Sequence, residues 1–598
     1  MQREDGRFGL GIALLFVAAI YVATPVSPPH LMDDVDGVQA QISRTMLVSG
    51  DWVTPRLDGV IYLEKPPLKY WMIACSYAVF GVHDWAARLP IVICILLTAW
   101  LVGAMGRWAF GKQAGFYSTL AFGSGVGLFL FTRVLISDVL LTGTIALATW
   151  GLARTLDDEE PRPRLWIYIA WASIGAGLLL KGLIAIVFPF GAAALYLLLS
   201  GQLFAARTWR RLRPFSGLAL MLLVAAPWHI LATLRNPPYL SFSMHAGPGQ
   251  YRGFFWFYFF NEHVLRFLNR RWPHDYNTVP RHLFWLFHLL WFFPWSVYLP
   301  RLVKLSYRGA DRASRLRLLC LCLAGFVMFF FSFSTTQEYY SLPIYPAVAL
   351  LLGGAMVEGS SWIRYGNRVL GAVCALALAG VVFILVNVWN MPAPGDISRA
   401  LAQHPEMYTL SLGHMGDLTL ASFAYLKLPL LLAGVAFAVA VLAAFRKPGR
   451  LCYVLIAFSM VLLLNAARVA MIAFDPYLSS QPLAEALRQA PPGRVVFDDQ
   501  YYTFSSVFFY ADVQNAKLLN GRVNNLEYGS YAPGAPDVWL TDPQLPDYWN
   551  QPRRTYLLAE QPQLPRFERL LGRERLHVVK ESGGKFLFVN QPLVANQP

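Results

Sequence analysis

Two short stretches of the sequence carry the side chains best suited to chemistry. Asp33, Asp34 and Asp36 stand close together, and Glu64 comes directly before Lys65. A carboxylate in a low-dielectric setting can serve as a general base, carboxylate oxygens suit a hard divalent cation, and lysine holds a phosphate as a compact point charge. We therefore expect either a site that deprotonates a hydroxyl beside a phosphate, or a plain solvated loop mouth.

Further candidates lie in a polar loop from 235 to 281 and at two helix ends. In the loop, the cluster Glu262-His263-x-x-Arg266 is a candidate metal and phosphate site, although a single histidine is more often structural, and Arg270 is a further candidate for the phosphate. Lys181 ends an apolar stretch, where a long side chain reaches water by snorkelling. Asp138 begins another apolar stretch and has no such stem, so snorkelling does not explain it.

Helices in a membrane must position these residues. Of the 598 residues, 56% are hydrophobic and 14% charged, whereas soluble proteins have roughly 25% charged residues. This composition excludes a disordered chain, argues against an ordinary soluble enzyme and predicts a polytopic α-helical membrane protein. Apolar runs of about 20 residues each suffice to cross a bilayer. We expect about 13 transmembrane helices, near 8–26, 86–105, 113–131, 136–153, 165–180, 183–200, 214–234, 282–300, 316–334, 342–358, 367–390, 425–445 and 451–474.

The net charge of +15 is explained by membrane topology. If the N-terminus is cytoplasmic, every short inside loop is basic, which is the positive-inside pattern. Nucleic acid binding is therefore not expected. The 6 cysteines all lie in apolar runs, so no disulfide framework is predicted.

The expected domain boundary follows residue 474. Residues 1–474 form the transmembrane domain, which includes the outer loops 27–85 and 235–281. Residues 475–598 have ordinary polarity and short strand-like runs, with a hairpin around Gly583-Gly584. An odd number of spans places this segment outside, so we expect a C-terminal periplasmic soluble α/β domain.

Two helices in the first outer loop are expected to lie along the membrane surface. In the stretch 38–49, Val38, Ile42 and Met46 share one face, as an interfacial helix requires. The stretch 67–80 is apolar but too short to span comfortably. If it did span, every later loop would change sides and the basic pattern would break.

Several motifs resemble the bacterial aminoarabinose transferases that modify lipid A. Those enzymes belong with the protein O-mannosyltransferases in the GT-C class of membrane glycosyltransferases. The likeness runs from about residue 8 to residue 360, and its most specific parts are Ser-Gly-Asp-Trp at 49–52 and Glu-Lys-Pro-Pro at 64–67. The other matching motifs are Ile42-Ser43-Arg44-Thr45-Met46-Leu47, Ala86-Ala87-Arg88-Leu89-Pro90, Ser137-Asp138, Lys181-Gly182, Glu262-His263, Pro294-Trp295 and Tyr345-Pro346-Ala347.

The resemblance implies an inverting transfer of a sugar from a polyprenyl-phosphate donor on the periplasmic face. The family's acidic residue after the first helix corresponds to the aspartate cluster, with Asp34 favoured as the base and Asp36 as the runner-up. This chain lacks the family's Asp-Glu pair there, and it has Thr335–Tyr340 where the family often carries lysines. Both departures favour a sugar or acceptor other than aminoarabinose and lipid A.

Residue chemistry and resemblance together give a role to each candidate. The acceptor hydroxyl would lose its proton to an aspartate, while cations and a divalent metal of unknown identity hold the departing phosphate. The expected catalytic residues are Asp33, Asp34, Asp36 and Asp138; the donor phosphate would bind Lys65, Lys181, Arg270 and Arg56; Tyr62, Tyr339 and Tyr340 would line the sugar pocket; Glu64 and His263 would hold the metal.

The partners expected are a polyprenyl-phosphate-linked sugar and a lipid, glycan or protein acceptor, at the bacterial inner membrane. A transporter or flippase of lipid-linked saccharides is the alternative, and a carrier-binding protein without catalysis is a third reading. Transport sites usually lie near the membrane midplane, whereas the acids here lie at outer helix ends. The placement of the acids therefore favours the enzyme.

Overall fold

All thirteen apolar runs fold as helices, whole or broken, in a computed structural model that describes residues 2–245, 247–274, 278–402 and 411–593. Within these ranges, nine helices are long and apolar enough to cross a membrane, or up to eleven if each of two bent pairs is one span. The chain is therefore a multi-pass helical membrane protein, while the number thirteen stays a prediction. The single helices on these runs are α1 (Gln2–Tyr21), α4 (Asp84–Phe110), α7 (Asp138–Leu156), α8 (Pro163–Lys181), α9 (Ile184–Leu199), α11 (Pro214–Arg235), α16 (Arg312–Phe331), α17 (Tyr345–Glu358), α18 (Ser361–Val388), α19 (Lys427–Ala444) and α20 (Arg450–Leu478).

Two of the expected spans are bent. Helix α5 (Lys112–Gly123) meets α6 (Val126–Thr132) at 50°, and the helical stretch Arg281–Trp291 meets Trp295–Leu302 at 99°. The second break falls at Pro294, whose ring nitrogen has no hydrogen to donate to the helix. The two breaks contact each other: the Val126 nitrogen donates a hydrogen bond of 3.1 Å to the Phe293 carbonyl, and the rings of Phe131 and Trp291 lie 5.2 Å apart.

The first outer loop folds as predicted but packs against a different partner. It contains α2 (Val35–Ser49), a hairpin of β1 (Arg56–Leu57) and β2 (Val60–Ile61), and α3 (Leu68–Phe80). The apolar face of α2 is buried in one cluster with Phe504, Val507 and Phe508 of the C-terminal part. The expectation that this face lies on the membrane surface is therefore wrong, because another part of the chain covers it.

The C-terminal segment, residues 479–593, is built around a six-stranded sheet. The strand order is β5-β4-β3-β6-β8-β7, with β3 to β6 parallel to one another and β8 antiparallel to both β6 and β7. The register pairs Val496 with Leu557 in the centre, and the predicted hairpin is the β7–β8 pair. The strands are β3 (Arg494–Asp498), β4 (Lys517–Leu519), β5 (Trp539–Leu540), β6 (Thr555–Glu560), β7 (His577–Ser582) and β8 (Lys585–Val589); the helices are α21 (Gln481–Gln489), α22 (Ser505–Tyr510), α23 (Asn524–Ser530), α24 (Leu545–Trp549) and α25 (Leu564–Leu571).

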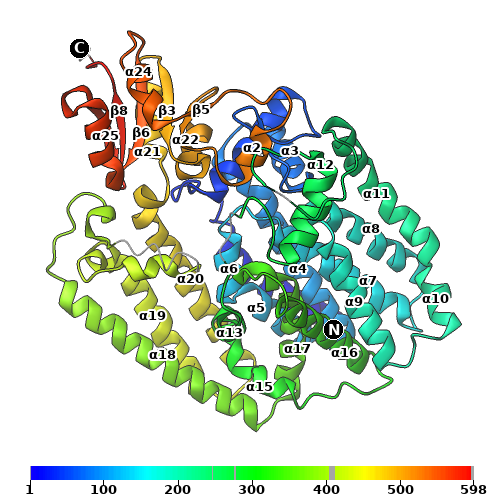
Figure 1. The fold of residues 1–598 in the computed structure, drawn as a ribbon. Helices are drawn as coiled ribbons and strands as arrows, with labels where there is room; N and C mark the ends of the chain where they lie inside the picture. Colours follow the sequence, from blue (N-terminus) through cyan, green and yellow to red (C-terminus); the bar gives the residue numbers. More distant parts are fainter. Residues whose placement is uncertain (1, 246, 275–277, 403–410, 594–598) are drawn as a thin grey trace.

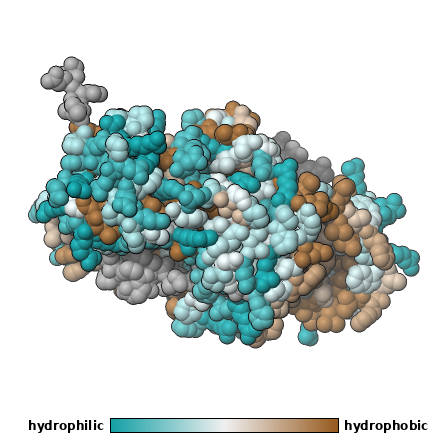
Figure 2. All heavy atoms as spheres, turned by 45° about the horizontal axis from the view of Figure 1, so that its top comes forward, coloured by the Kyte–Doolittle hydropathy of each residue, from teal (hydrophilic) through white to brown (hydrophobic). Residues whose placement is uncertain are grey.

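Basic loops and candidate site residues occupy opposite ends of the helices. At the end of α7, Arg154 pairs with Glu160, and Arg312 lies 2.8 Å from Asp157 in the adjoining loop. Asp138 begins α7 at its other end, where Lys181 ends the neighbouring helix α8. The C-terminal segment lies on that side with α2 and α3 (Figure 1). Figure 2 shows hydrophilic residues over this segment and hydrophobic residues gathered on the right of the view.

Candidate active site

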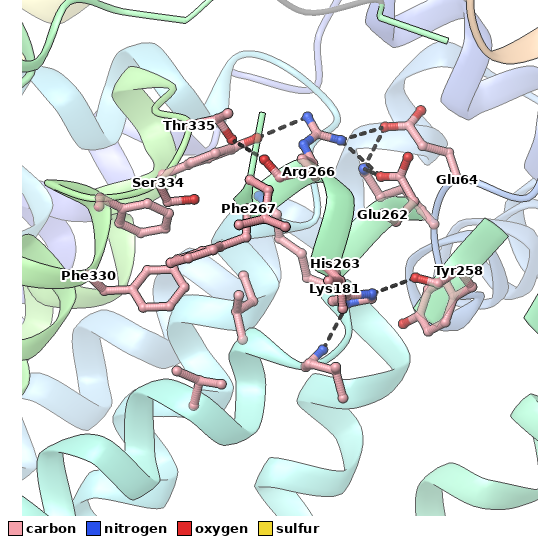
Figure 3. Close-up of a pocket in the computed structure, with 18 of the residues that line it drawn as sticks. Glu64, Lys181, Tyr258, Glu262, His263, Arg266, Phe267, Phe330, Ser334 and Thr335 are labelled. Atoms are coloured by element: carbon pink, nitrogen blue, oxygen red, sulfur yellow. Dashed lines mark hydrogen bonds and ion pairs between the residues drawn. The ribbon is translucent and has the colours of Figure 1, made fainter. Parts of the chain in front are cut away.

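A cavity of about 370 Å³ lies between the first outer loop and the helix ends, and one end is charged while the other is apolar (Figure 3). The π-helix η1 (Trp256–Leu265) runs along one side of it. The charged end carries Glu64, Lys65, Asp138, Lys181, Glu262 and Arg266; the apolar end carries Leu183, Ile184, Val187, Val264, Phe267, Leu268, Phe330 and Phe331; Tyr258, His263, Ser334, Thr335 and Tyr340 complete the lining.

Alternating charges make up the first part of the polar end. The Lys65 ammonium lies 2.5 Å from Glu64 and 3.7 Å from Glu262. The guanidinium of Arg266 lies 2.9 Å from Glu262 and 3.9 Å from Glu64, and it donates a hydrogen bond of 3.0 Å to the Tyr340 hydroxyl. Glu262 and Arg266 stand one helical turn apart, a spacing that favours their pairing. Each cation therefore touches both carboxylates.

The C-terminal segment reaches into this network through Asn525. Arg271 is buried behind the cavity, where it donates to Glu262 and to the Asn525 side-chain oxygen. The amide nitrogen of Asn525 donates to Glu64 Oε2 at 2.9 Å and to the Tyr502 hydroxyl at 3.2 Å. The network thus joins the first outer loop, η1 and the C-terminal segment.

The second part of the polar end is an ion pair on an aromatic wall. The Lys181 ammonium bonds to the Asp138 carboxylate, and both side chains line the cavity. The same ammonium lies 4.5 Å from the centre of the Tyr340 ring and 5.2 Å from that of Tyr339. An aromatic face stabilises a cation at such distances. Asp138 and Lys181, predicted from separate helix ends, therefore meet at the site.

The cations keep both glutamates ionised despite their burial. Burial raises the pKa of Glu64, but Lys65, Arg271 and Arg266 more than offset it, so the pKa lies below its usual range. The pKa of Glu262 is lowered for the same reason, with Arg271 the strongest of the cations. Lys65, Lys181, Arg266 and Arg271 outnumber the three carboxylates of the site, so the polar end is receptive to an anion.

The aspartate cluster does not face the cavity. Asp33 accepts hydrogen bonds from Lys585 at 2.6 Å and from the Ser506 backbone at 2.9 Å, and Asp34 is exposed at the start of α2. Asp36 is buried, with its carboxylate 2.8 Å from the Leu135 nitrogen, and burial raises its pKa. The expectation that these aspartates meet Glu64 and Lys65 in one crevice is wrong, since contacts with the C-terminal segment and the 133–137 loop turn them elsewhere.

Asp36 is nevertheless connected to the site through the loop that precedes Asp138. Its carboxylate accepts a hydrogen bond from the Leu135 backbone nitrogen, and the Leu135 carbonyl accepts one of 3.0 Å from Lys69. This backbone stretch leads directly into Asp138. Burial, reinforced by the Lys65 charge, lowers the pKa of Lys69 to about 7. Asp36 and Lys69 thus both bond to the backbone of Leu135, in the loop that leads to Asp138.

The remaining predicted residues divide between the cavity and its surroundings. Tyr62 lies behind Glu64 and donates its hydroxyl hydrogen to that carboxylate, and Tyr339 supports Lys181. Arg270 is exposed outside the cavity lining, and Arg56 donates to the Gly59 carbonyl within the β1–β2 hairpin at 3.1 Å. The predicted meeting of Arg270 and Arg56 with Lys65 is therefore wrong, because their loops turn away.

The environment of His263 does not fit a metal ligand. Its Nδ1 lies 2.6 Å from the Tyr258 carbonyl and its Nε2 accepts a hydrogen bond of 3.1 Å from the Leu183 nitrogen, so both ring nitrogens are engaged. Burial lowers the pKa of His263 to about 4, which keeps the ring neutral. In the parts of the chain that the structure describes, no group of three or more His, Cys, Asp and Glu is arranged to hold a metal. We derive no chemical step through a metal, and its presence stays a prediction.

Two residues of the site, Arg271 and Asn525, were not assigned a role from the sequence. Glu262 and Arg266 were expected as part of a Glu-His-x-x-Arg cluster, and both line the cavity; Arg271 lies in the same polar loop, whose density of charge was its signal. Asn525 is a neutral residue in a segment of ordinary composition and gives no such signal. Its role is visible once the C-terminal segment is folded onto the first outer loop.

Comparisons with known proteins agree with this architecture. A family model described as dolichyl-phosphate-mannose-protein mannosyltransferase matches residues 64–231. The fold is that of the crystal structures of ArnT from Cupriavidus metallidurans: the structure bound to undecaprenyl phosphate superposes with a TM-score of 0.76 at 21% identity over 98% of both chains. The apo structure gives a TM-score of 0.74 at 21% identity, covering 97% of this chain and 98% of that one. The chain is thus a polytopic membrane protein with the GT-C fold of ArnT.

Sequence relatives narrow this resemblance to one group of enzymes. The undecaprenyl phosphate-alpha-4-amino-4-deoxy-L-arabinose arabinosyl transferase of Pseudomonas aeruginosa (strain UCBPP-PA14) is 30% identical over 389 residues, which cover 62% of this chain and 65% of the relative. The corresponding enzyme 1 of Sodalis glossinidius is 30% identical over 403 residues, covering 64% and 66%. The aligned region therefore spans slightly less than two thirds of these relatives. The resemblance to aminoarabinose transferases and protein mannosyltransferases predicted from the motifs is confirmed.

Proposed function

We propose that this protein is an inverting glycosyltransferase that moves a sugar from a polyprenyl-phosphate donor to a lipid, glycan or protein acceptor. The observation that carries the proposal is the cavity with one cationic and one apolar end. A polyprenyl phosphate has the same division, a phosphate joined to a long apolar chain. The relatives named above act with undecaprenyl phosphate as carrier, and a structure with the same fold binds that lipid.

In this proposal the donor phosphate binds Lys65 and Arg266, and its chain leaves along the apolar end beside Val187 and Phe267. Both cations lie at the cavity surface and carry hydrogen-bond donors suited to phosphate oxygens. The sugar then lies over the Asp138–Lys181 pair, with the Tyr340 ring as its wall. Such a wall suits a sugar, whose C–H bonds pack on aromatic faces.

The chemical step needs one base and one stabilised leaving group. The acceptor hydroxyl oxygen attacks the anomeric carbon, the bond from that carbon to the phosphate oxygen breaks, and the acceptor proton passes to a carboxylate. We assign the base to Asp138, since it lines the cavity whereas Asp33, Asp34 and Asp36 do not. Lys65 and Arg266 stabilise the charge that gathers on the departing polyprenyl phosphate.

The proposed setting is the bacterial inner membrane, with thirteen spans, a cytoplasmic N-terminus and the site on the periplasmic side. Support comes from the basic loops, which lie at the end of α7 opposite Asp138. Residues 475–598 would then form a periplasmic α/β domain, and residues 1–474 the transmembrane domain. The sheet of β3 to β8 and its contact with α2 support this division.

The test is transfer by purified protein. The protein is incubated with undecaprenyl phosphate carrying tritium-labelled sugars, one of them 4-amino-4-deoxyarabinose, and with a membrane extract as the acceptor source. We expect release of undecaprenyl phosphate that depends on the extract, with the label moving to an acceptor. In reconstituted vesicles, label that crosses the bilayer while still joined to its carrier would instead support the transporter. Label that stays bound and unchanged would overturn catalysis.

A paired variant tests the phosphate assignment. Lys65→Gln removes a charge at the cavity, and we expect it to weaken undecaprenyl phosphate binding about 10- to 100-fold, since a charge-assisted hydrogen bond is lost. Lys517→Gln is the control, because that lysine lies on the C-terminal sheet beside Asp537. Equal affinity of both variants would contradict the assignment.

A further inference from the structure

The contact between the C-terminal segment and the charged end of the cavity gives that segment a part in the reaction. We propose that Asn525 is a positioning residue that fixes Glu64 and Arg271 in their working orientations. The inference rests on the proposed function and extends it, because it assigns to the C-terminal segment a residue of the site. The motifs of the resemblance all lie before residue 360 and do not include it.

The chemistry of the amide matches its two neighbours. The Asn525 oxygen accepts from Arg271, which has donors alone, and its nitrogen donates to Glu64, which as a carboxylate has acceptors alone. The reverse orientation would set the amide hydrogens against a guanidinium and the oxygen against a carboxylate. A neutral side chain with one acceptor and one donor group is thus what this gap requires.

Asn525 and Arg271 are buried, and Glu64 is largely buried. Asn525 is 6% exposed and Arg271 is 2% exposed, so water does not substitute readily for either partner. Glu64 receives further hydrogen bonds from Lys65 and from Tyr62, and Tyr62 accepts one of 3.3 Å from Tyr502. Loss of the amide therefore removes the side chain that bonds directly to both Glu64 and Arg271.

Helix α23 holds the amide in place from two sides. A Cβ atom added at Gly529 would lie 2.0 Å from the Ile61 carbonyl oxygen, so the helix backbone rests directly on strand β2. On its other side, the Tyr528 ring stacks 4.3 Å from Phe257, and the Tyr528 hydroxyl donates to the Gly253 carbonyl at 2.9 Å. The helix therefore packs against the first outer loop on one side and η1 on the other, and these contacts fix the position of Asn525 between Glu64 and Arg271.

The positioning role predicts an effect on turnover rather than on donor binding. Lys65 and Arg266, which hold the phosphate, keep their contacts when Asn525 is shortened to alanine. Glu64 and Arg271 lose a shared partner. Because Glu64 pairs with Lys65, and Arg271 with Glu262, the partner of Arg266, the two cations that stabilise the departing phosphate lose part of their alignment, and a small misplacement of such groups costs up to about a hundredfold in rate. We expect Asn525→Ala to lower kcat about 10- to 100-fold and to leave the donor KM within about threefold.

A second variant separates positioning from folding. Asn525→Asp still offers Arg271 an acceptor, but it sets a new carboxylate against Glu64 and so raises the pKa of that group. Glu64 must be ionised to hold Lys65 and Arg266 at the phosphate, so we expect the acidic limb of the pH–rate profile of this variant to lie at higher pH than that of the wild type. A fold defect lowers the whole profile without moving it.

The experiment measures release of undecaprenyl phosphate by the full-length wild type, Asn525→Ala, Asn525→Asp and Ser530→Ala. Ser530 lies on the same helix and bonds to Arg522 at 2.8 Å, away from the cavity, so its variant should stay within about twofold of wild type. The inference is overturned if Asn525→Ala matches Ser530→Ala in kcat, or if the pH profile of Asn525→Asp does not move. A wild type that releases no carrier from any donor overturns the proposed function and this inference together, whereas an active wild type with unaffected variants overturns this inference alone.

Discussion

The buried pair of Glu262 and Arg271 allows a quantitative test of how the site is held together. Both side chains are almost fully buried, and Glu262 also accepts a hydrogen bond from Arg266 at 2.9 Å. The change Glu262→Leu leaves the Arg271 guanidinium buried beside an apolar side chain. Removing one partner of a buried ion pair costs about 3–5 kcal/mol of unfolding free energy.

The informative experiment is a double-mutant cycle. Arg271→Met should cost a similar amount, since it leaves Glu262 with less compensation for its burial. In Glu262→Leu with Arg271→Met, neither charge is left buried, and replacing a whole buried pair by apolar residues is often nearly neutral. The double variant should therefore lose at least about 2 kcal/mol less than the sum of the two single changes.

Unfolding can be followed by tryptophan fluorescence of the detergent-solubilised protein in increasing denaturant. The single variants Glu262→Leu and Arg271→Met are measured beside the double variant, and the midpoints and slopes give the three free energies. Additive losses would refute the argument, because additivity means that the two side chains do not depend on one another. A double variant less stable than the sum would refute it more strongly.

Three further predictions follow from particular contacts. Burial lowers the pKa of Lys69 to about 7, so between pH 7 and 10.5 the unfolded chain binds a proton that the folded chain has lost. The free energy of unfolding should therefore rise across this range by at most about 5 kcal/mol. Denaturant series at several pH values measure this slope, and Lys69→Met should remove it. Gly529→Ala should cost about 1–3 kcal/mol in thermal or denaturant unfolding because its Cβ meets the Ile61 backbone, whereas Gly325→Ala, with open space around it, should be tolerated. Val187→Trp should fill the apolar end of the cavity and weaken undecaprenyl phosphate binding at least about tenfold in a direct binding assay. A water-soluble prenyl phosphate of one isoprene unit should bind as before. Equal weakening of both lipids would mean that the polyprenyl chain binds elsewhere.

The sequence predicted the membrane helices well because one physical cause dominates them. A run of apolar residues long enough to cross a bilayer has few alternatives, so runs such as 367–390 fall on helices of the structure such as α18. The bend at Pro294 is the kind of detail that hydropathy misses, since a window average does not register one missing backbone hydrogen.

The sequence patterns did not predict the contacts between distant segments. The periodicity of Val38, Ile42 and Met46 correctly indicates a buried face, but periodicity does not name the partner, which is the C-terminal segment in place of the bilayer surface. Asp33 looks like a candidate base by residue type, yet Lys585 occupies its carboxylate.

The charged end of the cavity was predicted in part. Glu64 and Lys65 were identified by their residue types and the Glu-Lys-Pro-Pro motif, Asp138 because snorkelling does not explain it, and Lys181 through the resemblance. All four line the cavity. Glu64 was expected to hold a metal, whereas its carboxylate pairs with Lys65. Arg271 and Asn525 complete the network, but their roles depend on burial and on partners far along the chain. A local sequence pattern contains neither kind of information.

The bridge through Asn525 also sets an order of events during synthesis. Glu64 and Arg271 are made early, and all membrane helices are complete before α23 leaves the ribosome. A growing chain that has made every span still lacks the amide that bonds to both Glu64 and Arg271. The polar centre is thus completed only when the last quarter of the polypeptide has folded back onto the beginning, so a chain cut short before α23 would leave Glu64 and Arg271 without this shared partner.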